Sequence, residues 1–170
     1  MRSVLLRRVG AYVLDIVVLF AVLAPAGYLA QRALGVSPST PQEIYGALVL
    51  TFSVPAWTYF ALADRSRGGA TLGKRLLGLR TAAEDGGPVR ADRALARTAV
   101  KMVPWELAHA SSFLVAPALG EFSVASGVGL GASYVLSFAY LAQAWRTGGH
   151  RSVHDLVAGT RVERAVGGTA

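Results

Sequence analysis

The chain has 170 residues, of which 53% are hydrophobic and only 16% are charged, whereas roughly 25% of the residues of an average soluble domain are charged. Its net charge of +7 would favour a nucleic-acid partner in a soluble protein. The mean hydropathy of +0.43 instead indicates a membrane protein. We therefore expect no nucleic-acid partner, and we expect the positive charge to face the anionic lipids of the inner leaflet. The chain has no cysteine, which excludes disulfides, thiolate metal sites and cysteine nucleophiles.

Three stretches are apolar and long enough to cross a bilayer as helices, which takes about 20 residues. They are residues 9–31, 44–63 and 124–145. The third contains Gly127 and Gly131 in G-x-x-x-G spacing, which predicts the close approach of another helix.

The N-terminal stretch also has the basic start and small residues of a signal peptide. However, Asp15 interrupts its apolar run, and the run is longer than the apolar core of a signal peptide. We therefore interpret it as a membrane span.

Residues 102–119 have the right length for a fourth span, but they include Glu106, His109 and two prolines. With four spans and a cytoplasmic N-terminus, every Lys and Arg except Arg32 lies inside, as the positive-inside rule favours. The sequence thus predicts an all-α integral membrane protein of four transmembrane helices, a single domain over residues 1–165. Both termini would be cytoplasmic, with an internal basic loop at 64–101 and a cytoplasmic tail at 146–170.

The internal loop carries basic residues at helical spacing. We expect an interfacial amphipathic helix with a stripe facing the lipid headgroups and Leu95, Ala99 and Met102 opposite it. The stripe consists of Arg90, Arg93, Arg97 and Lys101. A second amphipathic stretch surrounds Leu72 and Leu76, and "EDGGPV" predicts a turn or short hairpin.

Asp15 lies about six residues inside the first span, roughly 9 Å below its start. An ionised carboxylate is expensive at that depth, so we expect it to face the bundle interior with a partner or water, or to be protonated. Arg8 is two turns earlier on nearly the same face and can reach toward it. The pair could be a transport site or a structural charge pair.

Other polar residues form weaker candidates. Glu106 and His109 provide two ligands in Glu-x-x-His spacing, too few for a metal site in one chain, and His150, His154 and Asp155 lack metal-site spacing. The string "GGATLGKR" places Lys74 as in a phosphate-binding loop, but Arg75 stands where Ser or Thr would hold magnesium. We predict no metal and no cofactor, and interpret Lys74 and Arg75 as anchors to lipid headgroups.

Three segments together resemble the RDD family of bacterial membrane proteins. They are "RRVGAYVLDIVVLF", "GATLGKRLLGLRT" and "HRSVHDLVAGTRV". The resemblance implies that Arg8, Asp15 and Asp155 are the Arg and two Asp that name the family. It also implies a multi-pass protein of the inner membrane, for which transport is the usual suggestion, and it does not imply an enzyme. The stretch 104–109 departs from shorter members and supports four spans.

Our leading hypothesis is a small oligomeric transporter or ion/proton exchanger that uses Asp15, with Arg8 and Asp155 controlling its charge. Four helices leave little room for a pathway in one chain, so we expect a homo-oligomer. The alternative is a non-transporting scaffold or assembly factor that docks an unidentified cytoplasmic protein through the basic loop. A third possibility, an intramembrane hydrolase, would need more than His109, Ser111 and Ser112, which are too local to form a triad.

Overall fold

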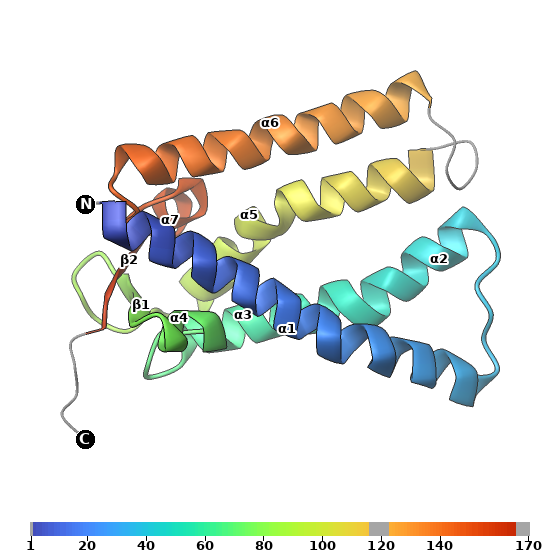
Figure 1. Cartoon of the computed structure of the whole chain (residues 1–170), viewed down its shortest axis with the longest axis horizontal. Coiled ribbons are helices and arrows are strands. Elements are labelled where there is room, and N and C mark those ends of the chain that lie inside the picture. The colour runs from blue at the N-terminus through green and yellow to red at the C-terminus, as the bar shows by residue number, and fades with distance from the viewer. Residues whose placement is uncertain (1, 116–122, 166–170) are drawn as a thin grey trace.

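The N-terminal apolar stretch forms one long helix. The computed structural model describes residues 2–115 and 123–165, and its first helix, α1, covers Arg2–Leu34 (Figure 1). Val17 and Phe20 on α1 are 58% and 45% exposed. In a membrane such side chains contact lipid, because the apolar run leaves no polar face for water.

The second apolar stretch forms a continuous rod of three helical parts. These are α2 (Pro41–Leu48), the π-helical η1 (Val49–Ser53) and α3 (Val54–Arg65). The rod begins with a capping box, because the Thr40 hydroxyl accepts from the Glu43 backbone N–H at 3.3 Å and the Glu43 carboxylate accepts from the Thr40 N–H at 3.1 Å. Phe52 and Phe60 of the rod are buried against Leu19 of α1.

The last two long helices lie side by side (Figure 1). They are α5 (Ala91–Ala110), which continues into the π-helical η2 (Ser111–Val115), and α6 (Val124–Arg146). Ser123 caps α6 by accepting from the Ser126 backbone N–H at 3.0 Å. The rest of the predicted outer connection 120–123, the end of the predicted span 102–119 and residues 166–170 of the tail lie outside the described residues.

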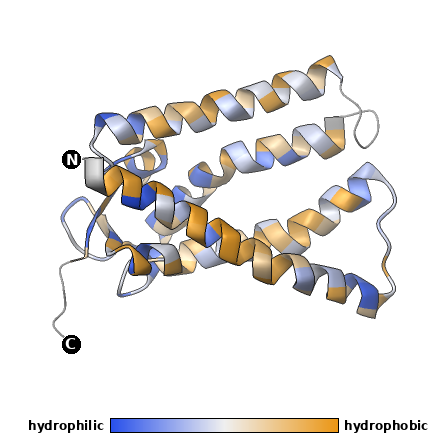
Figure 2. Cartoon of the chain, in the orientation of Figure 1, coloured by the Kyte–Doolittle hydropathy of each residue, from blue (hydrophilic) through white to orange (hydrophobic). Residues whose placement is uncertain are grey.

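Three helices are long and apolar enough to cross a membrane. They are Val4–Leu34, Pro41–Arg65 and Val124–Arg146, which correspond to the predicted stretches 9–31, 44–63 and 124–145. The chain is therefore a mostly helical membrane protein. Figure 2 shows more hydrophilic residues on α5 than on these three helices, and a crossing by α5 stays a prediction.

Four short elements gather at one end of the bundle, around the start of α1 (Figure 1). They are α4 (Leu72–Leu76), β1 (Leu79–Ala83), α7 (Val153–Ala158) and β2 (Thr160–Arg164), and we name them together the cap. β1 and β2 pair antiparallel, with Leu79 opposite Arg164 and Ala83 opposite Thr160. The all-α prediction is wrong here, because the strand before the predicted turn pairs with a segment far along the chain instead of closing a local hairpin.

Candidate functional site

A buried network of charges joins the cap to the long helices. Its centre is Arg97 of α5, which is 1% exposed and lies between two fully buried carboxylates, Asp64 of α3 and Asp155 of α7. Arg97 Nε donates to Asp155 Oδ1 at 2.9 Å, and Arg97 Nη1 forms an ion pair with Asp64 Oδ2. One guanidinium therefore bridges two acids from distant parts of the sequence, a use for which its planar set of donors suits arginine.

Two further cations complete the network on its outer sides. Lys74 Nζ of α4 donates to Asp64 Oδ1 at 2.6 Å and to the Thr81 hydroxyl of β1 at 2.7 Å. Arg8 of α1 forms an ion pair with Asp155 and donates to His154 Nε2 at 2.8 Å. Each buried charge in this network thus has an opposite charge beside it, which is the condition for keeping ions away from water.

Burial and neighbouring charge shift the protonation of the cap residues. Burial alone would raise the pKa of Asp155, but the positive charges of Arg97 and Arg8 outweigh it and hold that pKa well below its usual range. Burial lowers the pKa of His154 well below its usual value, more than Asp155 raises it. His154 is therefore neutral, in agreement with its acceptance of a hydrogen bond from Arg8.

Asp15 has its own set of partners, separate from Arg8. Its Oδ1 accepts from the Tyr59 hydroxyl and from the Gly73 backbone N–H, both at 2.8 Å. Gly73 is required there, because a Cβ at this position would lie 2.1 Å from the Ala11 carbonyl oxygen of α1. The expectation that Arg8 reaches Asp15 is wrong, because Arg8 turns instead to Asp155, whose place beside α1 is set by the fold of the C-terminal segment.

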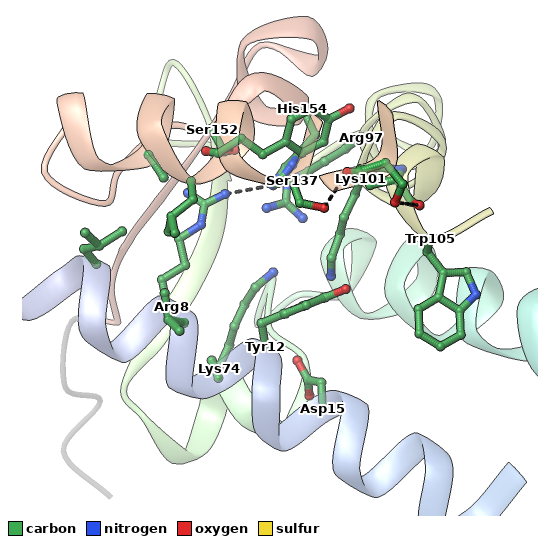
Figure 3. A pocket seen from close by; sticks show the side chains of 18 of the residues that line it. Arg8, Tyr12, Asp15, Lys74, Arg97, Lys101, Trp105, Ser137, Ser152 and His154 are labelled. Atoms are coloured by element: carbon green, nitrogen blue, oxygen red, sulfur yellow. Dashed lines mark hydrogen bonds between the residues drawn. The ribbon is translucent and has the colours of Figure 1, made fainter. Parts of the chain in front are cut away.

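A cavity of about 350 Å³ lies between α1, α5 and α6, and Lys74 and His154 of the cap line it at one end. Figure 3 shows Asp15 and Tyr12 reaching into it from α1 and Lys101 from α5. The other cations in its lining are Arg8, Lys74 and Arg97, and the neutral His154 ring lines it as well. The site thus combines one membrane-embedded carboxylate with several cations around a space large enough for a ligand.

The predicted lipid-facing stripe divides in two. Arg90 and Arg93 are exposed, as expected, but Arg97 is buried in the charge network and Lys101 is half-buried in the cavity. The prediction is wrong for these last two residues, because two buried acids bind Arg97 and the Lys101 ammonium lies over the Phe60 ring. Leu95, expected on the opposite face, is 61% exposed, whereas Met102 is buried.

The two basic residues of "GGATLGKR" also differ in their surroundings. Arg75 is exposed and donates from Nε to the Ala70 carbonyl at 3.2 Å. Lys74 is 6% exposed, so the interpretation of Lys74 as a headgroup anchor is wrong. The motif instead has a structural reason, since Thr71 caps α4 by accepting from the Lys74 backbone N–H at 3.3 Å while the Lys74 ammonium neutralises Asp64.

Glu106 and His109 do not come together at a common point. Glu106 Oε1 accepts from Trp57 Nε1 at 3.0 Å, and the His109 ring packs at a tilt against Trp105 with centroids 4.2 Å apart. Within residues 2–115 and 123–165, no three His, Asp or Glu side chains form a group that could hold a metal ion. His150 contacts the Val162 carbonyl through Nδ1 at 2.8 Å and is likewise part of the cap structure.

The close helix contact on α6 is displaced from the predicted one. Nothing lies within 4 Å of a Cβ built on Gly127 or Gly131, but a Cβ on Gly129 would lie 2.0 Å from the Ser111 hydroxyl. The described part of the chain therefore uses Gly129 for helix contact, on another face of α6.

Sequence reasoning missed three residues of the site: Tyr12, Tyr59 and Asp64. Asp64 had a detectable signal, because it is an acid at the inner end of an apolar span, next to a loop rich in Lys and Arg. The two tyrosines had none, since aromatic residues near span ends are common at membrane interfaces.

Comparison with known proteins gives one family. The sequence profile of the RDD family matches residues 2–159, nearly the whole chain. No curated protein and no solved structure matched significantly.

Proposed function

The chain belongs to the RDD family, and on this basis we propose that it is a multi-pass protein of the bacterial cytoplasmic membrane that exchanges ions or protons as a small oligomer. In this proposal the cap faces the cytoplasm and residues 102–119 form the fourth span. Asp15 is the titratable group, and the network of Arg8, Arg97 and Asp155 fixes the charge around it.

The observation that supports exchange most directly is the place of Asp15 in the cavity. Its Oδ1 is held by Tyr59 and Gly73, while the side chain lines a space that also contains the Lys101 ammonium. A carboxylate in lipid is costly unless it is paired or hydrated, and acids kept at such depths often mark ion pathways. No ion pair joins Asp15 to a cation in the described residues, so pairing alone does not explain it.

The four-span topology is supported by the position of the chain ends. The start of α1 and the end of β2 lie at the same end of the bundle (Figure 1), as four crossings would place them. Because the chain has no cysteine, single cysteines can test this directly. We expect Ser37→Cys and Glu121→Cys to react with an impermeant maleimide from outside the cell, and Asp85→Cys to react only after the membrane is opened. Labelling of Glu121→Cys only after opening would contradict the fourth span.

Exchange itself is tested by proton and cation flux in proteoliposomes containing equal amounts of each variant. Asp15→Asn keeps an oxygen that can accept from Tyr59 and Gly73, so it should fold but lose flux. Asp85→Asn makes the same change at an exposed turn and should retain flux. Undiminished flux in Asp15→Asn would contradict the role of Asp15.

Absence of flux in folded wild-type protein would favour the second candidate, a scaffold. The observation behind it is the set of exposed arginines on or near the cap: Arg65, Arg67, Arg75, Arg90 and Arg93. This surface differs from the stripe expected from sequence, because Arg97 and Lys101 are inside. A scaffold predicts that neutralising Arg90 and Arg93 removes a bound partner while Asp15→Asn does not.

A further inference from the structure

Lys101 differs from the other cations around the cavity in having no acid beside it. Arg8, Lys74 and Arg97 each form an ion pair with Asp64 or Asp155. The Lys101 ammonium instead lies 3.1 Å from the centre of the Phe60 ring and 4.9 Å from that of Tyr12. No hydrogen bond or ion pair reaches it within the described part of the chain.

The surroundings of Lys101 also disfavour its charge. Burial, together with the positive charges of Lys74 and Arg97, lowers the pKa of Lys101 well below its usual value, more than Asp64 and Asp15 raise it. Contact with an aromatic face offsets only part of such a desolvation. The Lys101 ammonium in the cavity therefore lacks a neighbouring negative charge that would stabilise it.

A second donor lies beside Lys101 without a partner. The Tyr12 hydroxyl makes no hydrogen bond to the described residues, and Tyr12 is 39% exposed on the cavity side of α1. Figure 3 shows Tyr12 and Lys101 reaching toward the same space from opposite helices. Together they offer an ammonium and a hydroxyl to one acceptor-rich group.

One side of the cavity is lined by exposed apolar side chains. Val9 of α1 and Leu141 of α6 line it and are 42% and 47% exposed, and α1 and α6 diverge beyond them (Figure 1). Tyr12 follows the start of the predicted span by three residues, roughly 5 Å along the helix. The donors thus lie near the depth of the headgroups of the inner leaflet, with an apolar side open to acyl chains.

We propose that this cavity binds the phosphate group of an anionic amphiphile, with the Lys101 ammonium and the Tyr12 hydroxyl contacting phosphate oxygens and Val9 and Leu141 contacting its apolar part. A membrane phospholipid and a soluble phosphate ester share the phosphate chemistry, and only the phospholipid uses the apolar side. The proposal does not depend on ion exchange, because binding can be measured in protein that transports nothing.

The test is a thermal-shift titration of the full chain in nanodiscs of phosphatidylcholine. In one arm phosphatidylglycerol is added to the lipid, and in the other glycerol phosphate is added to the buffer. We expect phosphatidylglycerol to raise the Tm of wild type. Lys101→Gln should weaken the apparent affinity for phosphatidylglycerol about tenfold, as for the loss of one charge-assisted hydrogen bond. Arg90→Gln removes an exposed positive charge just before the same helix and should retain the full effect.

Lys101→Gln breaks no ion pair, so its Tm without anionic lipid should stay close to that of wild type. If it nevertheless fails to fold, Tyr12→Phe tests the same site by removing only the hydroxyl. A Lys101-dependent shift with glycerol phosphate as well would support a phosphate site that accepts soluble esters. Equal losses in Lys101→Gln and Arg90→Gln would show general surface attraction and overturn the proposal, as would the absence of any shift in both arms.

Discussion

The cap and the middle of the bundle are held together by different forces. At the cap, ion pairs join residues far apart in the sequence, such as Arg8 and Arg97 with Asp155. In the middle of the bundle, rings pack without directional bonds: Phe52 lies 4.5 Å from Phe20 and 5.2 Å from Trp105 between centroids. A buried ion pair fails sharply when one partner is removed, whereas apolar packing weakens in proportion to the volume of side chain that is removed.

The largest effect should follow from removing the central cation of the charge network that joins the cap to the long helices. Arg97→Gln leaves Asp64 and Asp155 buried with too little positive charge, and breaking a buried pair in this way costs about 3–5 kcal/mol. We expect the variant to lose most of its folded fraction in detergent, measured by size-exclusion chromatography and Tm. Arg97→Lys restores the positive charge but cannot bind Asp64 and Asp155 at the same time with a planar guanidinium, so it should recover only part of the folded fraction. Arg90→Gln, at the exposed position just before the same helix, should behave as wild type. A wild-type Tm for Arg97→Gln would contradict the expected effect.

Acid should destabilise the cap more than the middle of the bundle. Because the folded-state pKa of Asp155 is lowered, its contribution is complete above its unfolded-state pKa of about 4 and is lost as the pH falls further. The Tm of wild type should therefore decrease below about pH 4. Asp155→Asn should begin with a lower Tm near neutral pH and lose less on acidification. If the Tm of the two proteins decreased equally with pH, Asp155 would not be the cause of the acid sensitivity.

A smaller loss should come from filling the contact between α4 and α1. Gly73→Ala places a methyl group 2.1 Å from the Ala11 carbonyl oxygen, and overpacking of this kind costs roughly 1–3 kcal/mol. Gly68→Ala is the matched control, because nothing lies within 4 Å of its Cβ position. Thermal unfolding of both variants in the same detergent measures the difference, and equal Tm values would show that α4 can shift freely.

The smallest effect should be found away from the cap, at the start of α2. Thr40→Ala removes one half of the capping box with Glu43, a change worth about 1 kcal/mol. We expect a slightly lower Tm and unchanged stability of the charge network, because the two regions share no polar contact through these residues. A loss as large as that of Arg97→Gln would contradict the contrast between the two regions.

The predictable parts of the molecule are those whose signal is local. The apolar stretches 9–31, 44–63 and 124–145 lie within long helices, because length and hydropathy are properties of one segment. The sequence motifs also identified the family and drew attention to Arg8, Asp15 and Asp155. The function of these residues is not settled by their positions.

The parts that sequence reasoning could not predict depend on pairing between distant segments. Helical spacing places Arg97 on the same face of its helix as Arg93. It contains no information about Asp64 and Asp155, the two acids that form ion pairs with Arg97 in the interior. Likewise, the strand at residues 79–83 pairs with a distant strand: Thr81 lies opposite Val162, which is 81 residues further along the chain. The cavity depends on three helices at once, so neither Tyr12 nor Lys101 could be assigned to it from the sequence.

The pairing of Arg97 with Asp155 also has a consequence for the time course of synthesis. Arg8, Asp64, Lys74 and Arg97 all leave the ribosome before Asp155, which follows Arg97 by 58 residues, or roughly 3–12 s at bacterial and slower rates of translation. During that interval three cations share one carboxylate, and both strand β2 and its closing contact with β1 are still absent. The nascent protein thus carries an uncompensated positive cluster until Asp155 is synthesised, and the charge network can close only after that.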